Sequence, residues 1–233
     1  MKKTLGIIGG MGPLATVKLF EKLVLFTDAH SDQEHLRILI DNNTSIPDRT
    51  AYILGIGEDP IPNLIDSATK LKSIGADYLI MPCNTAHYFY DDILKSIDIP
   101  FLSMIEETAK YIIKEFKGVK DIGLLATEGT YKANVYDDVF KNYNLNIVKP
   151  ELEKQKYVMD LIYDIKKGIF HKDFNDFNRV LEELKEKNVD IFIMGCTELS
   201  VALDLYNLRG NYIDPLEIIA KKAIEFGGGK VVK

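Results

Sequence analysis

Asp77-Tyr-Leu-Ile-Met-Pro-Cys83 and Asp190-Ile-Phe-Ile-Met-Gly-Cys196 are two similar stretches of one chain. Their Asp, Ile, Met and Cys residues match at a constant offset of 113 residues. Each stretch is a short apolar run of strand length that ends at a cysteine, and Thr85 or Thr197 follows shortly after. We therefore expect two equivalent strands, each with a cysteine just beyond its carboxyl end.

The rest of the chain alternates between strand and helix patterns. Short apolar runs predict strands at 5–8, 36–40, 78–81, 121–125 and 191–194. Helical spacing of apolar residues predicts helices at 63–74, 177–187 and 215–226. This alternation is typical of an α/β fold with mostly parallel sheets flanked by helices, in which ligands bind beyond the carboxyl ends of the strands.

The first strands of the two halves also match, since Gly6-Ile-Ile-Gly corresponds to Gly123-Leu-Leu-Ala. We expect two similar lobes related by a pseudo-two-fold duplication, with the site in the cleft between them. Lobe one would comprise residues 1–99 plus 210–233 and carry Cys83, and lobe two would comprise residues 100–209 and carry Cys196. The simpler alternative is that all strand–helix units look alike. Gly227-Gly228-Gly229 is expected to be a frayed tail.

Composition excludes several classes of function. The 233 residues carry 29 Lys+Arg against 35 Asp+Glu, and this net charge of −6 argues against a nucleic-acid partner. No window approaches the ~20 apolar residues of a membrane span, and no signal peptide is recognised. We expect a cytoplasmic protein without membrane contact, in which disulfides are rare.

Cys83 and Cys196, the only cysteines, lie where helices are expected to begin. Backbone N–H groups and the helix dipole at such a place favour a thiolate and lower the thiol pKa. Two thiols at equivalent positions could invert a stereocentre, because one would remove a proton from a carbon and the other would return a proton to the opposite face. A single-nucleophile hydrolase would need only one cysteine with a nearby histidine.

The carbanion formed by removing a Cα proton needs stabilising donors on its carboxylate. Asn84 and Thr85 beside the first cysteine, and Thr197 beside the second, suit this task together with N–H groups at helix starts.

Six motifs, in order along nearly the whole chain, resemble the aspartate/glutamate racemases that need no pyridoxal phosphate. They are Gly9-Gly10-Met11-Gly12-Pro13, Asn42-Asn43 with Pro47-Asp48-Arg49-Thr50, Met81-Pro82-Cys83-Asn84-Thr85-Ala86-His87, Ala126-Thr127-Glu128-Gly129-Thr130, Ile165-Lys166-Lys167-Gly168 and Met194-Gly195-Cys196-Thr197-Glu198. The resemblance implies a two-lobed fold, a homodimer, and a racemase that needs neither cofactor nor metal.

The resemblance also implies roles for individual residues. Cys83 and Cys196 would be the catalytic acid/base pair. Arg49 and Lys166 would hold the side-chain carboxylate of the substrate, one cation from each lobe. The remaining substrate-binding residues that we expect are Met11, Asn84, Thr85, Thr127 and Thr197. The implied substrate is aspartate, with glutamate or a broader range of amino acids as the alternative.

Other interpretations remain open at this stage. Gly9-Gly10-Met11-Gly12 resembles a nucleotide-binding loop, but its spacing differs from G-x-G-x-x-G. Cys83, His87 and Cys196 could hold a metal, although no C-x-x-C pair supports this. His87 could instead assist Cys83 or only pack.

Two further alternatives concern the cations and the class of protein. Arg49 could form a surface salt bridge with Asp48, and Lys166 could be a solvated helix lysine. The chain could also be a two-lobed protein that binds small dicarboxylates without chemistry.

Overall fold

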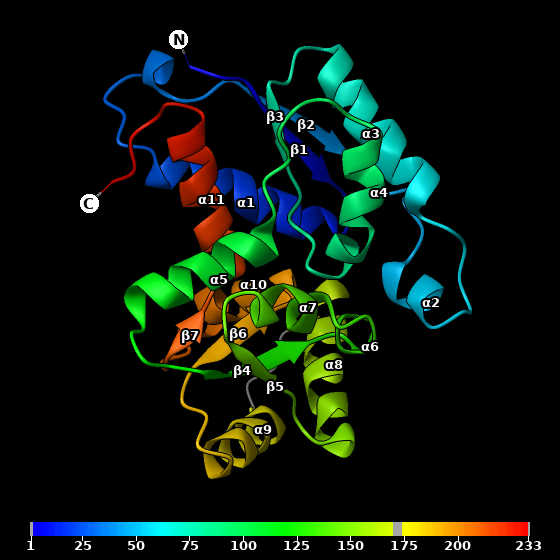
Figure 1. The fold of residues 1–233 in the computed structure, drawn as a ribbon, viewed down its shortest axis with the longest axis vertical. Helices are drawn as coiled ribbons and strands as arrows, with labels where there is room; N and C mark the ends of the chain where they lie inside the picture. The colour runs from blue at the N-terminus through cyan, green and yellow to red at the C-terminus, as the bar shows by residue number, and fades with distance from the viewer. Residues whose placement is uncertain (1, 170–173, 233) are drawn as a thin grey trace.

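The computed structural model describes residues 2–169 and 174–232, so the parts of the predicted lobe ranges at residues 1, 170–173 and 233 lie outside it. Its strands form two separate parallel sheets with helices on both faces, which confirms the predicted fold class (Figure 1). The first sheet has the order β2-β1-β3 and the second β5-β4-β6-β7.

The first sheet consists of β1 (Leu5–Gly9), β2 (Ile38–Asn42) and β3 (Tyr78–Ile80). Leu5 and Ile7 point to one face, against α1 (Pro13–Phe26) and α11 (Pro215–Phe226). Ile8 points to the opposite face, which α3 (Ile61–Ser73) and α4 (Tyr90–Lys95) cover. The alternation follows from the two-residue period of a strand, and it explains why β1 reads as a continuous apolar run.

The second sheet consists of β4 (Asp121–Ala126), β5 (Asn146–Val148), β6 (Phe192–Gly195) and β7 (Tyr212–Ile213). One face packs on α8 (Leu152–Lys166), α9 (Asn175–Glu186) and α10 (Thr197–Tyr206). The other face packs on α5 (Met104–Glu115), α6 (Glu128–Lys132) and α7 (Val135–Lys141). Shorter elements are η1 (Asp32–Glu34), α2 (Arg49–Ile53) and η2 (Thr85–Phe89). The predicted strands at 121–125 and 191–194 match β4 and β6 within one residue.

The last helix, α11, follows the second sheet in sequence but packs in the core of the first, where the Tyr78 hydroxyl donates a 2.7 Å hydrogen bond to the Ala223 carbonyl. The expectation of a frayed tail after it was wrong. Lys3 N–H donates to the Gly227 carbonyl, and Thr27 forms an antiparallel bridge with Val231. The tail is held because it pairs with backbone that leaves α1. The lobe boundaries themselves stay predictions.

Candidate active site

All nine sequence-predicted site residues line a small cavity between the two sheets. Its lining residues are Met11, Asp48, Arg49, Thr50, Cys83, Asn84, Thr85, Thr127, Lys166, Cys196, Thr197 and Glu198. Most of them follow the carboxyl ends of β1, β3, β4 and β6, where parallel sheets place ligands. The free volume is about 10 Å³, roughly one water, so the cleft is closed.

The loop after β1 carries Met11 into this cavity. Gly10 has a positive φ of 91°, and a Cβ there would come within 2.4 Å of the Asn43 backbone. Only glycine fits this close approach. The chain then enters α1 at Pro13, a position where proline costs no helical hydrogen bond.

Cys83 is buried in a loop that His87 holds in place. His87 Nε2 accepts a hydrogen bond from Met104 N–H at 3.1 Å, so Nδ1 carries the proton and donates to the Cys83 carbonyl at 2.8 Å. Burial lowers the pKa of His87 to about 4. The ring is therefore neutral with both nitrogens bonded to backbone, which excludes it here as a metal ligand or a proton carrier for Cys83.

Cys196 is buried directly at the N-cap of α10. Its thiol donates a 2.8 Å hydrogen bond to Glu198 Oε2. Burial raises the pKa of Cys196 well above its ordinary value, and the Glu198 carboxylate raises it further. The expectation of a lowered pKa was therefore wrong for this thiol, because desolvation and a neighbouring carboxylate outweigh the helix dipole.

The donors beside Cys83 are tied to the second sheet's helices. Asn84 Oδ1 accepts a 2.6 Å hydrogen bond from the Tyr136 hydroxyl, so its amide NH₂ points elsewhere. That nitrogen is buried and has no partner. The Thr85 hydroxyl lies 3.0 Å from that of Thr127 and 2.8 Å from that of Thr130, in a hydroxyl cluster that joins both halves of the cleft.

Arg49 lies at the start of α2, and its Nη1 donates to the carbonyls of Ile46 and Pro47 at 3.2 and 2.9 Å. Asp48 does not pair with it among the described residues; the Asp48 carboxylate accepts from Ala51 N–H and caps α2 instead. Arg49 Nε is buried without a partner. Unpaired buried donors on cavity-lining residues are what a site for an anionic ligand leaves before the ligand binds.

Lys166 ends α8 and reaches the same cavity. Its Nζ lies 3.9 Å from Glu198 Oε1. Burial opposes its charge, but the nearby Cys196, Glu198 and Cys83 sites together raise the pKa of Lys166. The lysine is thus a charged member of the site, and the alternative of a freely solvated helix lysine is not what the structure shows.

Sequence reasoning assigned no role to Glu198, Thr50 or Asp48. Glu198 stands in a quoted motif, two residues after Cys196, and a carboxylate in the first turn of a helix lies close to the cap residue. That spacing could have found it. Thr50 lines the cavity and packs closely against Gly129 of α6, since a Cβ on Gly129 would come within 2.7 Å of the Thr50 hydroxyl. No local signal reveals this contact, because it joins distant segments.

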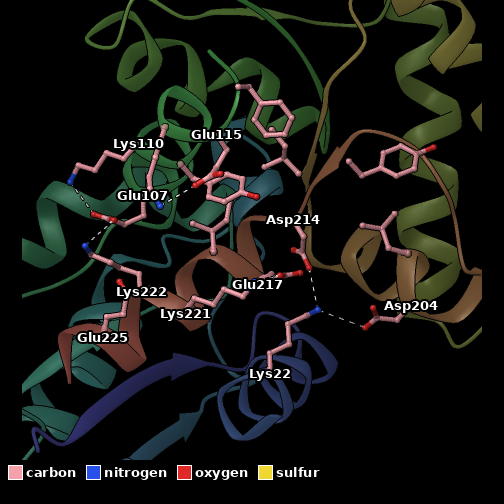
Figure 2. Close-up of a pocket in the computed structure, with 17 residues that line it drawn as sticks. Lys22, Glu107, Lys110, Glu115, Asp204, Asp214, Glu217, Lys221, Lys222 and Glu225 are labelled. Carbon is pink, nitrogen blue, oxygen red and sulfur yellow. Dashed lines mark hydrogen bonds and ion pairs between the residues drawn. The ribbon is translucent and has the colours of Figure 1, made fainter. Parts of the chain in front are cut away.

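A larger cavity of about 550 Å³ lies elsewhere, among α1, α5, α10, β7 and α11, and contains none of the predicted site residues. Figure 2 shows that several of its charged side chains pair with one another, as Lys22 does with Asp204 and Asp214 and Lys222 with Glu107. These charges are already paired within the protein. The small cavity differs, because donors on Arg49 and Asn84 there have no partner.

Within residues 2–169 and 174–232, no three His, Cys, Asp or Glu side chains are grouped as a metal site requires. Nor does this part of the chain contain a helix with the length and apolar character to cross a bilayer.

Residues 8–223 match the family model of the Asp/Glu/Hydantoin racemases. The chain belongs to this family. The match confirms the resemblance read from the six motifs and identifies the chain as an isomerase of the racemase type. Its similarity to relatives with different substrates does not select one amino acid.

Three racemase relatives illustrate that range. The structure is similar to Picrophilus torridus aspartate racemase, with a TM-score of 0.84 and 35% identity, covering 99% of this chain and 96% of that one. A broad specificity amino-acid racemase of Bacillus subtilis is 29% identical over 225 residues, 94% of this chain and 96% of the relative. A glutamate racemase of Persephonella marina is 26% identical over 145 residues, 60% of this chain and 53% of the relative.

Proposed function

We propose that this racemase inverts Cα of an acidic amino acid, aspartate in the first place, by proton transfer between Cys83 and Cys196. The observation that carries the proposal is that both thiols and two cations, Arg49 and Lys166, line one closed cavity. A carboxylate in the substrate's side chain can pair with these two cations, and the substrate's Cα would then lie within reach of the thiols.

In the proposed reaction, one cysteine thiolate takes the Cα proton and becomes a thiol. The other cysteine gives its thiol proton to the opposite face of the carbanion and becomes a thiolate. Atoms and charge balance without any added cofactor, and the roles reverse for the other enantiomer.

The carbanion places charge on the α-carboxylate. The unpaired amide of Asn84 and the hydroxyls of Thr85 and Thr127 are the donors that we assign to it. Tyr136 keeps the Asn84 amide turned so that its NH₂ is free for this bond. The cleft has to open for entry, because a free volume of about 10 Å³ cannot hold an amino acid.

Aspartate is preferred over glutamate because the relative with 35% identity and nearly full coverage is an aspartate racemase. One methylene in a pocket is worth only ~1–3 kcal/mol. The Bacillus subtilis relative makes broad specificity the second candidate.

The test is incubation of purified protein with L-aspartate in D₂O and no cofactor, followed by NMR and chiral chromatography. We expect deuterium at Cα and formation of D-aspartate, with glutamate and neutral amino acids slower. Folded protein that exchanges Cα of neither aspartate nor glutamate would contradict the proposal. A Cys83→Ala, Cys196→Ala double variant controls for background exchange.

A further inference from the structure

We propose that Glu198 holds the proton on Cys196 in the free enzyme and so makes this cysteine the resting acid of the pair. The inference rests on the proposed function, since a resting acid matters only where two thiols exchange protons. Neither the family match nor the relatives' names assign a role to Glu198.

Contact geometry supports the assignment. The Cys196 thiol donates to Glu198 Oε2 at 2.8 Å, a short distance for a sulfur donor. Both side chains are buried, with exposed fractions of 7% and 4%, so water competes little for this bond. Glu198 lies in the first turn of α10, where the helix dipole stabilises a carboxylate.

Glu198 also lies near Lys166, in a looser contact. Its Oε1 lies 3.9 Å from Lys166 Nζ, beyond hydrogen-bond distance. Glu198 Oε2 therefore accepts the hydrogen bond of the thiol, while Oε1 faces Lys166. When Cys196 gives its proton to the substrate, a thiolate is left beside a carboxylate, and Lys166 is placed to offset the two negative charges.

The two thiols differ in this respect. Among the described residues no carboxylate accepts a hydrogen bond from Cys83, and the residue two positions later is Thr85, a neutral hydroxyl. Burial together with the Glu198 charge raises the pKa of Cys196 well above its ordinary value. Cys196 therefore keeps its proton before the substrate arrives.

Alkylation of the free enzyme tests this directly, because iodoacetamide reacts with thiolates and releases iodide. The measurement is the rate at each cysteine across pH, resolved by peptide mass spectrometry and expressed as the ratio of Cys196 to Cys83. The ratio cancels differences in cleft opening. Glu198→Gln keeps the size of the side chain and removes its charge.

In Glu198→Gln we expect the midpoint for Cys196 alkylation to fall by at least about one pH unit, so that its rate at pH 8 rises about tenfold relative to Cys83. Glu183→Gln, the same change in another buried carboxylate of the second sheet's helices, should leave the ratio unchanged. An unchanged Cys196 midpoint in Glu198→Gln would overturn the proposal.

A second readout uses turnover. The enantiomers have equal free energy, so kcat/KM is the same in both directions, and its alkaline limb should move to lower pH in Glu198→Gln by the shift seen in alkylation. A raised KM with an unmoved Cys196 midpoint would instead mean that Glu198 binds the substrate ammonium group, and would also overturn the proposal.

Two features keep this test informative. If Glu198→Gln does not fold, Glu198→Asp is the second variant, because it moves the carboxylate away from the thiol while keeping its charge. The midpoint for Cys196 alkylation should still fall, by a smaller amount. A midpoint equal to that of the unmodified protein would overturn the proposal. Alkylation needs no substrate. The proton assignment can therefore fail while racemisation stands, or hold in a protein that racemises nothing.

Discussion

The loops that follow β3 and β6 have similar sequences but different chemistry. After β3, Cys83 leads into the short 3₁₀ helix η2 and is followed by the neutral side chains of Asn84 and Thr85. After β6, Cys196 caps a regular helix and donates to a carboxylate. The residue two positions after each cysteine, Thr85 or Glu198, makes the difference. The repeated strand end therefore gives the two thiols equivalent positions in the fold but different hydrogen-bonding environments.

Removal of each thiol in turn is expected to have the largest effect. Cys83→Ala and Cys196→Ala should each lower racemisation by at least about 10³-fold, since each supplies an acid or base that the other cannot replace. Chiral chromatography of aspartate after long incubation measures the loss, and circular dichroism checks the fold. Wild-type turnover in either variant would refute the two-thiol reaction.

On the Cys83 side of the cleft, His87 bonds to two backbone groups, and its burial makes stability depend on pH. Since burial lowers the pKa of His87 to about 4, the unfolded chain binds more protons between about pH 6.5 and 4. Stability should fall by about 3 kcal/mol as the pH drops through this range.

His87→Gln can keep both backbone bonds without titrating. Urea unfolding at several pH values should show that the variant loses this acid-dependent term. Equal slopes in the variant and the unmodified protein would show that His87 is not buried in its neutral form.

Arg49 tests whether the cations act on the substrate's side chain. Arg49→Ala should lower kcat/KM for aspartate by about 30- to 100-fold, as expected for a charge-assisted hydrogen bond of about 2–3 kcal/mol. Cα exchange of alanine in D₂O, which has no side-chain carboxylate, is the comparison. If exchange of alanine falls as much as that of aspartate, the side-chain role is wrong.

The smallest expected effect on activity comes from Tyr136, whose hydroxyl orients the Asn84 amide. Tyr136→Phe removes the bond that fixes the amide, and kcat/KM should fall about fivefold, which corresponds to about 1 kcal/mol. Tyr143→Phe is the matched control, because its hydroxyl bonds Glu106 away from the cavity. An equal loss in both variants would indicate a general effect on the helices rather than positioning.

Periodicity and the repeated cysteine stretch were sufficient to predict the two parallel sheets and the bounds of α11. They missed β5 and β7, because these short strands are only partly buried and form no continuous apolar run, unlike the equally short but fully buried β3. All nine predicted site residues line one cavity, but the Tyr136–Asn84 bond and the Thr50–Gly129 contact join distant segments. The raised pKa of Cys196 also escaped prediction, since burial is a property of the folded chain.

The position of α11 has a consequence for synthesis on the ribosome. The strands of the first sheet emerge early, but Leu216, Ile219 and Ala220, which complete their core, are translated only after the whole second sheet. At ~5–20 residues per second this delay is on the order of ten seconds. During that time the nascent first lobe exposes an apolar face, so chaperones have a defined target and the second lobe can finish folding first.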